Sequence, residues 1–103
     1  LIATETNHPK SLLLLYWKPL KLIRIAIDLV PTFITAFSWG CVVGNSDGQF
    51  LAIDYNGQPI SRFGTDKNVS AIASYGDTTL LVSTWHEDQG NLYILNLEHF
   101  LTL

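Results

Sequence analysis

The amino-acid sequence predicts an all-β protein whose strands pair antiparallel and recur at a regular spacing. Val, Ile, Leu, Tyr, Phe and Thr cluster in short runs, and Gly, Asn, Asp and Pro separate these runs. This pattern favours strands joined by turns. The run VVGNSDGQFLAID at residues 42–54 also has a near-echo about 40 residues later, LVSTWHEDQGNLYILN at 81–96, which indicates an internal repeat.

Ten strands are expected in order along the chain, because few segments show helical periodicity over a helix-like length. Their predicted bounds are 1–4, 12–16, 20–27, 33–37, 41–44, 50–55, 60–63, 69–74, 80–83 and 92–97.

Short turns connect these strands. In Asn45-Ser46-Asp47-Gly48, Gly48 can supply the positive φ that a tight turn needs. Asn56-Gly57 is the strongest hairpin signal in the chain. In the echo, a longer turn at 85–90 is expected in place of the first one. Such local connections pair consecutive strands antiparallel.

The repeat has four strands in a period of about 40 residues. Its copies match at 34–37 with 69–72, at 42–44 with 81–83, and at 48–51 with 90–93. Four strands in a period of this length are typical of a β-propeller blade. The predicted fold is therefore antiparallel four-stranded blades of a β-propeller, incomplete in this chain. The expected division is the end of one blade at 1–31, a complete blade at 32–67 and most of a third blade at 68–103.

The stretch GNSDGQFLAID resembles the strand–turn–strand signature of the WD-repeat family, in which an Asp and a Gly close the turn before the third strand. The resemblance implies a WD-like propeller. It also implies a structural role for Asp47, whose carboxylate would accept hydrogen bonds within the turn or from a neighbouring blade. In the echo, Asp88 lies near the matching place but is shifted. The family's terminal Trp-Asp pair appears here as Ile53-Asp54 and Leu95-Asn96, so a strict member is not predicted.

Closed propellers usually have at least four blades. The chain is therefore expected to be a piece of a larger propeller, or to complete one by assembly. The expected partners are other blades, from the same parent chain or from other copies, together with a protein partner.

Charge is spread unevenly along the chain. Residues 1–30 carry a net charge of +2 and the others a net charge of −5. The positive end predicts a basic docking edge at Lys18, Lys21 and Arg24, although solvated loop charges explain the asymmetry equally well. There is no dense Lys/Arg stripe, so a nucleic-acid partner is not predicted. The apolar segment 11–30 is interrupted by charges and Pro19, so a membrane span is not expected, and surface attachment is the weaker alternative.

No catalytic, cofactor or metal site is predicted, and the chain is not expected to be an enzyme. His86-Glu87-Asp88, with Asp77 and Glu98 elsewhere, is the one cluster with metal or acid–base potential, but no second His stands at a ligand-like spacing. A solvated turn is expected there. The lone Cys41 lies in an apolar run, which predicts a buried thiol and fits a reducing, cytoplasmic location.

The expected function is protein–protein interaction or scaffolding, as part of a WD-like propeller in a larger protein or complex. The candidate contact residues are the turn Trp85, His86, Glu87 and Asp88 together with the basic edge. Among the three tryptophans, packing is favoured over partner contact, and Trp85 is expected to be the exposed one. The alternative is a ligand-binding or catalytic propeller whose site lies largely in blades absent from this chain.

Overall fold

The computed structural model describes residues 2–5, 8–17 and 20–98, and every secondary-structure element in these ranges is a β-strand. The protein is therefore all-β, as predicted. Each of the ten predicted strands is present, with ends that differ by a few residues: β1 Ile2–Glu5, β2 His8–Trp17, β3 Leu20–Ala26, β4 Phe33–Ala36, β5 Gly40–Gly44, β6 Gln49–Asp54, β7 Pro59–Gly64, β8 Val69–Tyr75, β9 Thr79–His86 and β10 Gln89–Asn96. Within the same ranges, no helix has the length and apolar character needed to cross a membrane.

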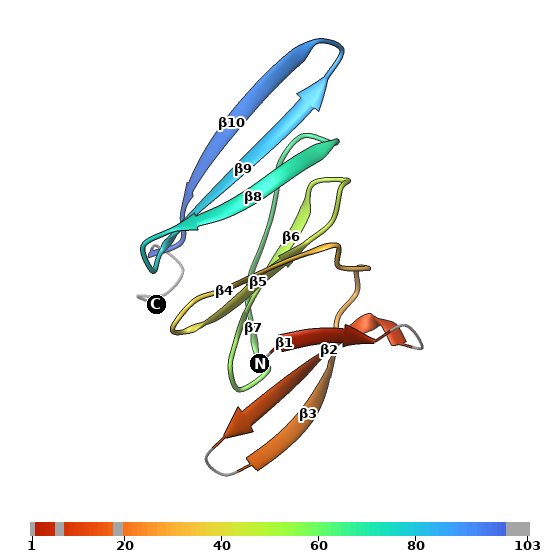
Figure 1. Ribbon diagram of the computed structural model, residues 1–103, viewed down its shortest axis with the longest axis vertical. Coiled ribbons are helices and arrows are strands. Elements are labelled where there is room, and N and C mark those ends of the chain that lie inside the picture. Colours follow the sequence, from red (N-terminus) through yellow and green to blue (C-terminus); the bar gives the residue numbers. More distant parts are fainter. Residues whose placement is uncertain (1, 6–7, 18–19, 99–103) are drawn as a thin grey trace.

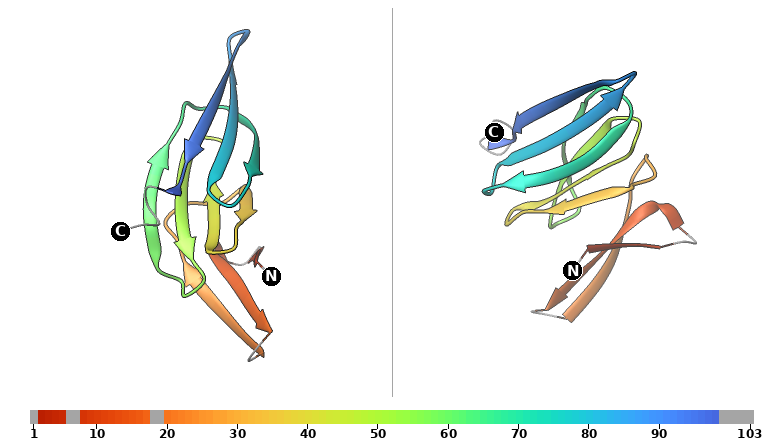
Figure 2. Two further views of the ribbon diagram at one scale, coloured as in Figure 1. Left: turned by 90° about the vertical axis from the view of Figure 1, so that its left-hand side faces the viewer. Right: turned by 45° about the horizontal axis from the view of Figure 1, so that its top comes forward.

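The strands form three antiparallel sheets that follow one another along the chain. The first sheet is β1-β2-β3, the second is β4-β5-β6-β7 and the third is β8-β9-β10. Within each sheet, strands that are consecutive in sequence are neighbours, which confirms the prediction of up-and-down hairpins. The sheets are stacked along the long axis of the molecule and do not close into a ring (Figures 1 and 2).

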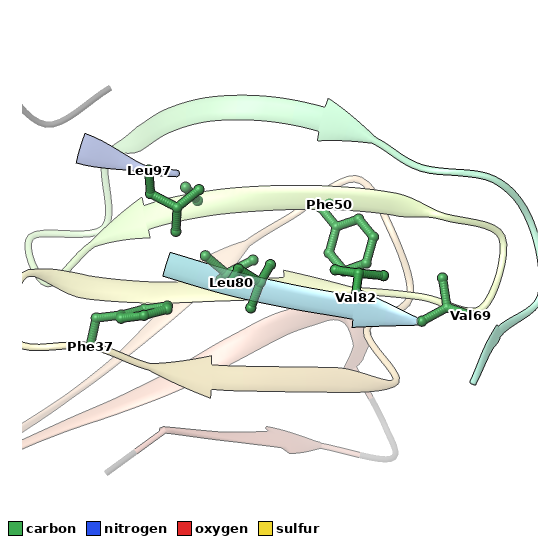
Figure 3. Packing of buried hydrophobic residues seen from close by; sticks show 8 residues of the cluster. Phe37, Phe50, Val69, Leu80, Val82 and Leu97 are labelled. Atoms are coloured by element: carbon green, nitrogen blue, oxygen red, sulfur yellow. The ribbon is translucent and has the colours of Figure 1, made fainter. Parts of the chain in front are cut away.

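The larger core lies between the second and third sheets (Figure 3). Because successive side chains of a strand point to opposite faces, Val42 of β5 and Phe50 of β6 face the third sheet, which contributes Leu80 and Val82 of β9. Burying each such aliphatic or aromatic side chain stabilises the fold by about 1.5–3 kcal/mol. Its buried members are Phe37, Val42, Phe50, Ala52, Val69, Leu80, Val82 and Leu97.

The opposite face of the second sheet is buried as well. A second cluster joins the alternate residues of β5 and β6 to Ile27 and Leu29, which follow the first sheet in the chain. The second sheet contributes Cys41, Val43, Leu51 and Ile53 to this cluster. All five residues of β5 are consequently buried, and Cys41 is a buried free thiol as predicted, whose pKa burial raises to about 11.

Two turns of the second sheet share one design, which the sequence repeats as NSDGQ and DYNGQ. In the first, the Asn45 side-chain oxygen accepts hydrogen bonds from the backbone N–H groups of Asp47 and Gln49, both at 3.1 Å. In the second, Asp54 Oδ1 accepts from the N–H groups of Asn56 at 2.9 Å and Gln58 at 3.0 Å. A side chain that bonds the backbone two residues ahead is a typical turn initiator.

A glycine follows at the same place in both turns. Gly48 and Gly57 each have φ of 85°, a conformation that glycine adopts without steric cost. In the second turn, Asn56 has a negative φ and donates its backbone N–H to Asp54. Gly57 is therefore the residue of this hairpin that adopts a positive φ. Within the first turn the side-chain acceptor is Asn45, and Asp47 donates its backbone N–H to it.

β4 and β8, the first strands of the second and third sheets, correspond to each other at residues different from those that the sequence echo predicts. The backbone pairs Ile34 with Val43 and Ile72 with Val82, so Ile72 is the structural counterpart of Ile34. The echo instead aligned 34–37 with 69–72. The two alignments differ by three residues, which the single β-bulge between Val69 and Ala71 does not account for.

Candidate partner-contact site

The predicted contact turn is the tip of the hairpin between β9 and β10, and it is tighter than predicted. The two strands stay paired as far as His86 opposite Gln89. Only Glu87 and Asp88 form the turn, with φ of 47° and 64°. Two consecutive residues with positive φ are the mark of a type I′ turn, whose twist matches that of paired strands. The expected longer turn at 85–90 is therefore wrong, because the strand ladder continues through Trp85 and Gly90.

Trp85 is the exposed aromatic residue of this hairpin. It lies on β9 opposite Gly90, and 56% of it is accessible to solvent. A Cβ atom on Gly90 would lie 3.0 Å from the Trp85 ring, so the indole covers this glycine. The Trp85 backbone N–H also donates to the Asn68 carbonyl at 3.1 Å. The indole is thus held on paired backbone while much of its surface stays open, as predicted.

His86 contacts one residue of the tip and one residue outside it. His86 Nε2 lies 3.6 Å from Glu87 Oε1, and Asn68 Nδ2 donates to His86 Nδ1 at 3.3 Å. These groups are exposed. Across the part of the chain that the structure describes, there is no group of three or more His, Cys, Asp or Glu residues arranged to hold a metal ion. The tip therefore offers an indole, an imidazole and two carboxylates to whatever contacts it.

The predicted basic edge belongs to the other end of the molecule. Arg24 is an exposed residue of β3 in the first sheet, whereas the tip of the β9–β10 hairpin lies at the opposite end of the long axis (Figure 1). Lys18 and the side chain of Lys21 lie outside the described residues. The structure therefore does not bring the two predicted contact groups together.

Asp77, in the turn between β8 and β9, connects the third sheet to the second by hydrogen bonds, a role that the sequence did not predict. Its Oδ1 accepts from the Ser38 backbone N–H at 2.9 Å, and its other carboxylate oxygen accepts from the Ser38 hydroxyl. Its backbone carbonyl accepts from Trp39 Nε1 at 2.7 Å. The hydrogen bonds from Ser38 hold the pKa of Asp77 below its usual value. No local pattern signals this contact, because Ser38 and Asp77 are 39 residues apart.

A second carboxylate also links distant segments. The Tyr93 hydroxyl of β10 donates to Asp66, which lies between β7 and β8. This hydrogen bond raises the pKa of Tyr93, because it is made by the protonated hydroxyl. Asp66 and Asp77 thus each form hydrogen bonds between segments that are far apart in the chain.

Trp39 has a packing role. Its ring stacks on Phe37 with centroids 5.1 Å apart and an interplanar angle of 11°. Because its N–H also bonds to Asp77, the side chain is fixed at both its apolar and its polar parts. Of the tryptophans whose side chains are described, Trp39 is therefore the packing residue and Trp85 is the one that is free to meet a partner.

The chain was compared with protein-family models, with curated proteins and with solved structures, and none of them matches it. The likeness to WD repeats therefore stays a prediction from the residues.

Proposed function

We propose that this chain is a protein-interaction module that forms part of a WD-like β-propeller in a larger protein or complex. The stacked, separately hydrogen-bonded sheets support this proposal, because propeller blades are antiparallel sheets packed face to face. In this proposal the blades that complete the ring come from the same parent chain or from other copies. The sheets act as a rigid frame, and the hairpin tips contact a protein partner.

The observation that carries the proposal is the exposed indole of Trp85 on a fixed hairpin. A tryptophan that is 56% accessible presents apolar surface that water does not solvate well. Its pairing with Gly90 and its bond to Asn68 mean that little conformational entropy is lost when a partner covers it. Tryptophan is also enriched among the residues that dominate binding energy at protein interfaces.

Site-specific photo-crosslinking tests this role. Trp85 is replaced by p-benzoylphenylalanine, which keeps an aromatic ring at the position, and the protein is irradiated in a cell extract. The matched control carries the same residue in place of Tyr75, an exposed aromatic residue of the same sheet. We expect position 85 to give a crosslinked product with a protein other than this chain. An excess of the native chain should suppress this product, whereas an excess of the Trp85→Ala variant should not.

Two results would contradict the proposal. One is the absence of any product specific to position 85. The other is equal suppression by the native chain and by Trp85→Ala, which would mean that the indole does not contribute to binding.

A further inference from the structure

The stacking of the sheets has a direction. One face of the second sheet, carrying Val42 and Phe50, packs against the third sheet. We call this the leading face. The other face, carrying Val43 and Leu51, packs against residues that follow the first sheet, and we call this the trailing face. The third sheet directs its own trailing face, with Val82, toward the second. Within this chain, the leading face of the second sheet therefore packs against the trailing face of the third sheet.

Among the residues that the structure describes, none covers Leu92 and Ile94 on the leading face of the third sheet. Along β10, Tyr93 and Leu95 pack toward the second sheet, so Leu92 and Ile94 point the opposite way. These two residues are 64% and 68% accessible. Their cross-strand neighbours on β9 are Ser83 and Leu81. A shallow hollow of about 200 Å³ lies on this face, lined by Ala71, Ala73, Leu81, Ser83 and Leu92, together with Ile72, whose side chain packs toward the second sheet.

The repeat shows what kind of surface covers such a face. In the echo GQFL and GNLY, Phe50 matches Leu92. Both lie on the leading face, but Phe50 is 2% accessible because the third sheet covers it. Leu92 thus occupies a position that, one sheet earlier, is buried by the trailing face of another sheet.

A trailing surface of this kind lies at the other end of the same molecule. Ile25 of β3 packs toward the second sheet, so Leu22 and Arg24 lie on the far side of that strand. Leu22 is 63% accessible, and Arg24 is exposed. Among the described strands, none is stacked on this side of the first sheet (Figure 1). One molecule therefore carries an open leading face at one end and an open trailing face at the other.

The charges of the two ends are complementary. Residues 68–103 contain acidic residues and no Lys or Arg, whereas residues 1–30 carry a net charge of +2. The acidic residues are Asp77, Glu87, Asp88 and Glu98. Two third sheets would repel each other, whereas a third sheet and a first sheet attract. Charge therefore favours a head-to-tail arrangement over a symmetric one.

We propose that the leading face of the third sheet binds the first sheet of a second copy of this chain, head to tail, and so extends the stack of sheets. This inference rests on the proposed function, in which stacked sheets are blades, and it names the blade partner. The contact is heterologous, since two different surfaces of the chain meet. Each added copy leaves one leading and one trailing face open until the ring closes.

Two blocking variants and their mixture test this arrangement. Ile94→Asp places a charge on the leading face, and Leu22→Asp places one on the trailing face. Val30→Asp is the matched control, because Val30 is an exposed apolar residue between β3 and β4 and belongs to neither face. Purified proteins are measured by light scattering over a range of concentrations, with circular dichroism to verify that each is folded.

We expect the native chain and Val30→Asp to form species heavier than the 11.5 kDa chain. Each blocking variant alone should be monomeric, because one of its two surfaces is lost. An equimolar mixture of the two should form a species of twice the chain mass and nothing heavier, since the intact leading face of Leu22→Asp meets the intact trailing face of Ile94→Asp. If either variant fails to fold, Leu92→Ser and Leu22→Ser replace them.

Three results would overturn the proposal. A native chain that is monomeric at every concentration would show that no second copy binds. Self-association of Leu22→Asp alone would indicate symmetric pairing of third sheets. A mixture that stays monomeric would remove the head-to-tail contact. None of these outcomes affects the crosslink from position 85 to a different protein, so the two proposals can fail separately.

Discussion

At the scale of single residues, glycines with positive φ form several of the turns. Gly48 and Gly76 both lie in turns, with φ of 85° and 65°, but their surroundings differ. A Cβ atom on Gly48 would lie 2.5 Å from the Thr65 carbonyl oxygen and 2.6 Å from that of Asp66. A Cβ atom on Gly76 would have nothing within 4 Å. A comparison of Gly48 with Gly76 therefore separates the effect of an unfavourable φ from the effect of steric crowding.

We predict that Gly48→Ala lowers the free energy of unfolding by about 2–4 kcal/mol, because it combines an unfavourable φ with a backbone collision. Gly76→Ala should lower it by about 1 kcal/mol, since only the φ is unfavourable. Urea denaturation followed by circular dichroism measures both. Equal losses in the two variants would mean that the segment at Thr65 moves aside freely.

At the scale of strands and sheets, matched positions differ in what covers them. Phe50 and Leu92 occupy the same place in two copies of the repeat, yet Phe50 lies in the core and stacks on Phe63 with ring centroids 5.5 Å apart. Its ring also covers Gly44, where a Cβ atom would lie 2.3 Å from Phe50 Cδ1. How much a repeat position contributes to the free energy of unfolding thus depends on whether a neighbouring sheet covers it.

We predict that Phe50→Leu lowers the free energy of unfolding by about 1–2 kcal/mol through lost contacts and imperfect packing. Leu92→Ala should change it by less than about 0.5 kcal/mol in dilute, monomeric protein, because the side chain is exposed. Denaturant titration at low protein concentration tests the comparison. A large loss for Leu92→Ala under these conditions would show that its face is covered within the monomer.

The bond between the β4–β5 turn and the β8–β9 turn makes stability depend on pH. The pKa of Asp77 is lowered from 3.8 in the folded state by its hydrogen bonds from Ser38, so folding favours the ionised carboxylate. Its contribution is present in full above about pH 5, and it is lost as the pH falls through 3.8 and then through the lower folded-state pKa.

We predict that Asp77→Asn reduces the loss of stability that the native chain shows as the pH falls below about 5. Thermal unfolding temperatures of the native chain and the variant should differ near neutral pH and converge as the pH falls below 3.8. Ser38→Ala should reduce the same pH dependence, because it removes the hydroxyl that donates to the carboxylate. A constant difference across the whole pH range would show that ionisation of Asp77 is not linked to folding.

At the scale of the whole molecule, the described sheets differ in how many of their faces are covered. The second sheet is covered on both faces, whereas the third sheet is covered on one. Local opening is rarest where most apolar surface is buried. The middle of the stack should therefore unfold only when the whole molecule does.

We predict that native-state hydrogen exchange is slowest in β5 and β6 and faster in β10. Mass spectrometry of peptides from a time course of deuteration measures this order. Head-to-tail assembly should slow exchange selectively in β9 and β10 as the protein concentration rises, because it covers the leading face of the third sheet. Exchange in β10 that is as slow as in β5 in dilute protein would contradict the picture of an open face.

The strands, their antiparallel order and the turns at Gly48 and Gly57 could be predicted from local patterns, because alternation along a strand and the positive φ of a glycine are local properties. The sequence did not predict that Glu87 and Asp88 alone form the last turn. These two non-glycine residues have positive φ, and the turn is this short because β9 and β10 stay paired up to them. The bonds made by Asp66 and Asp77 join segments far apart in the chain and leave no local signal. Which apolar faces are covered could not be predicted from the sequence, because burial depends on the neighbouring sheet and not on the strand that carries the residues.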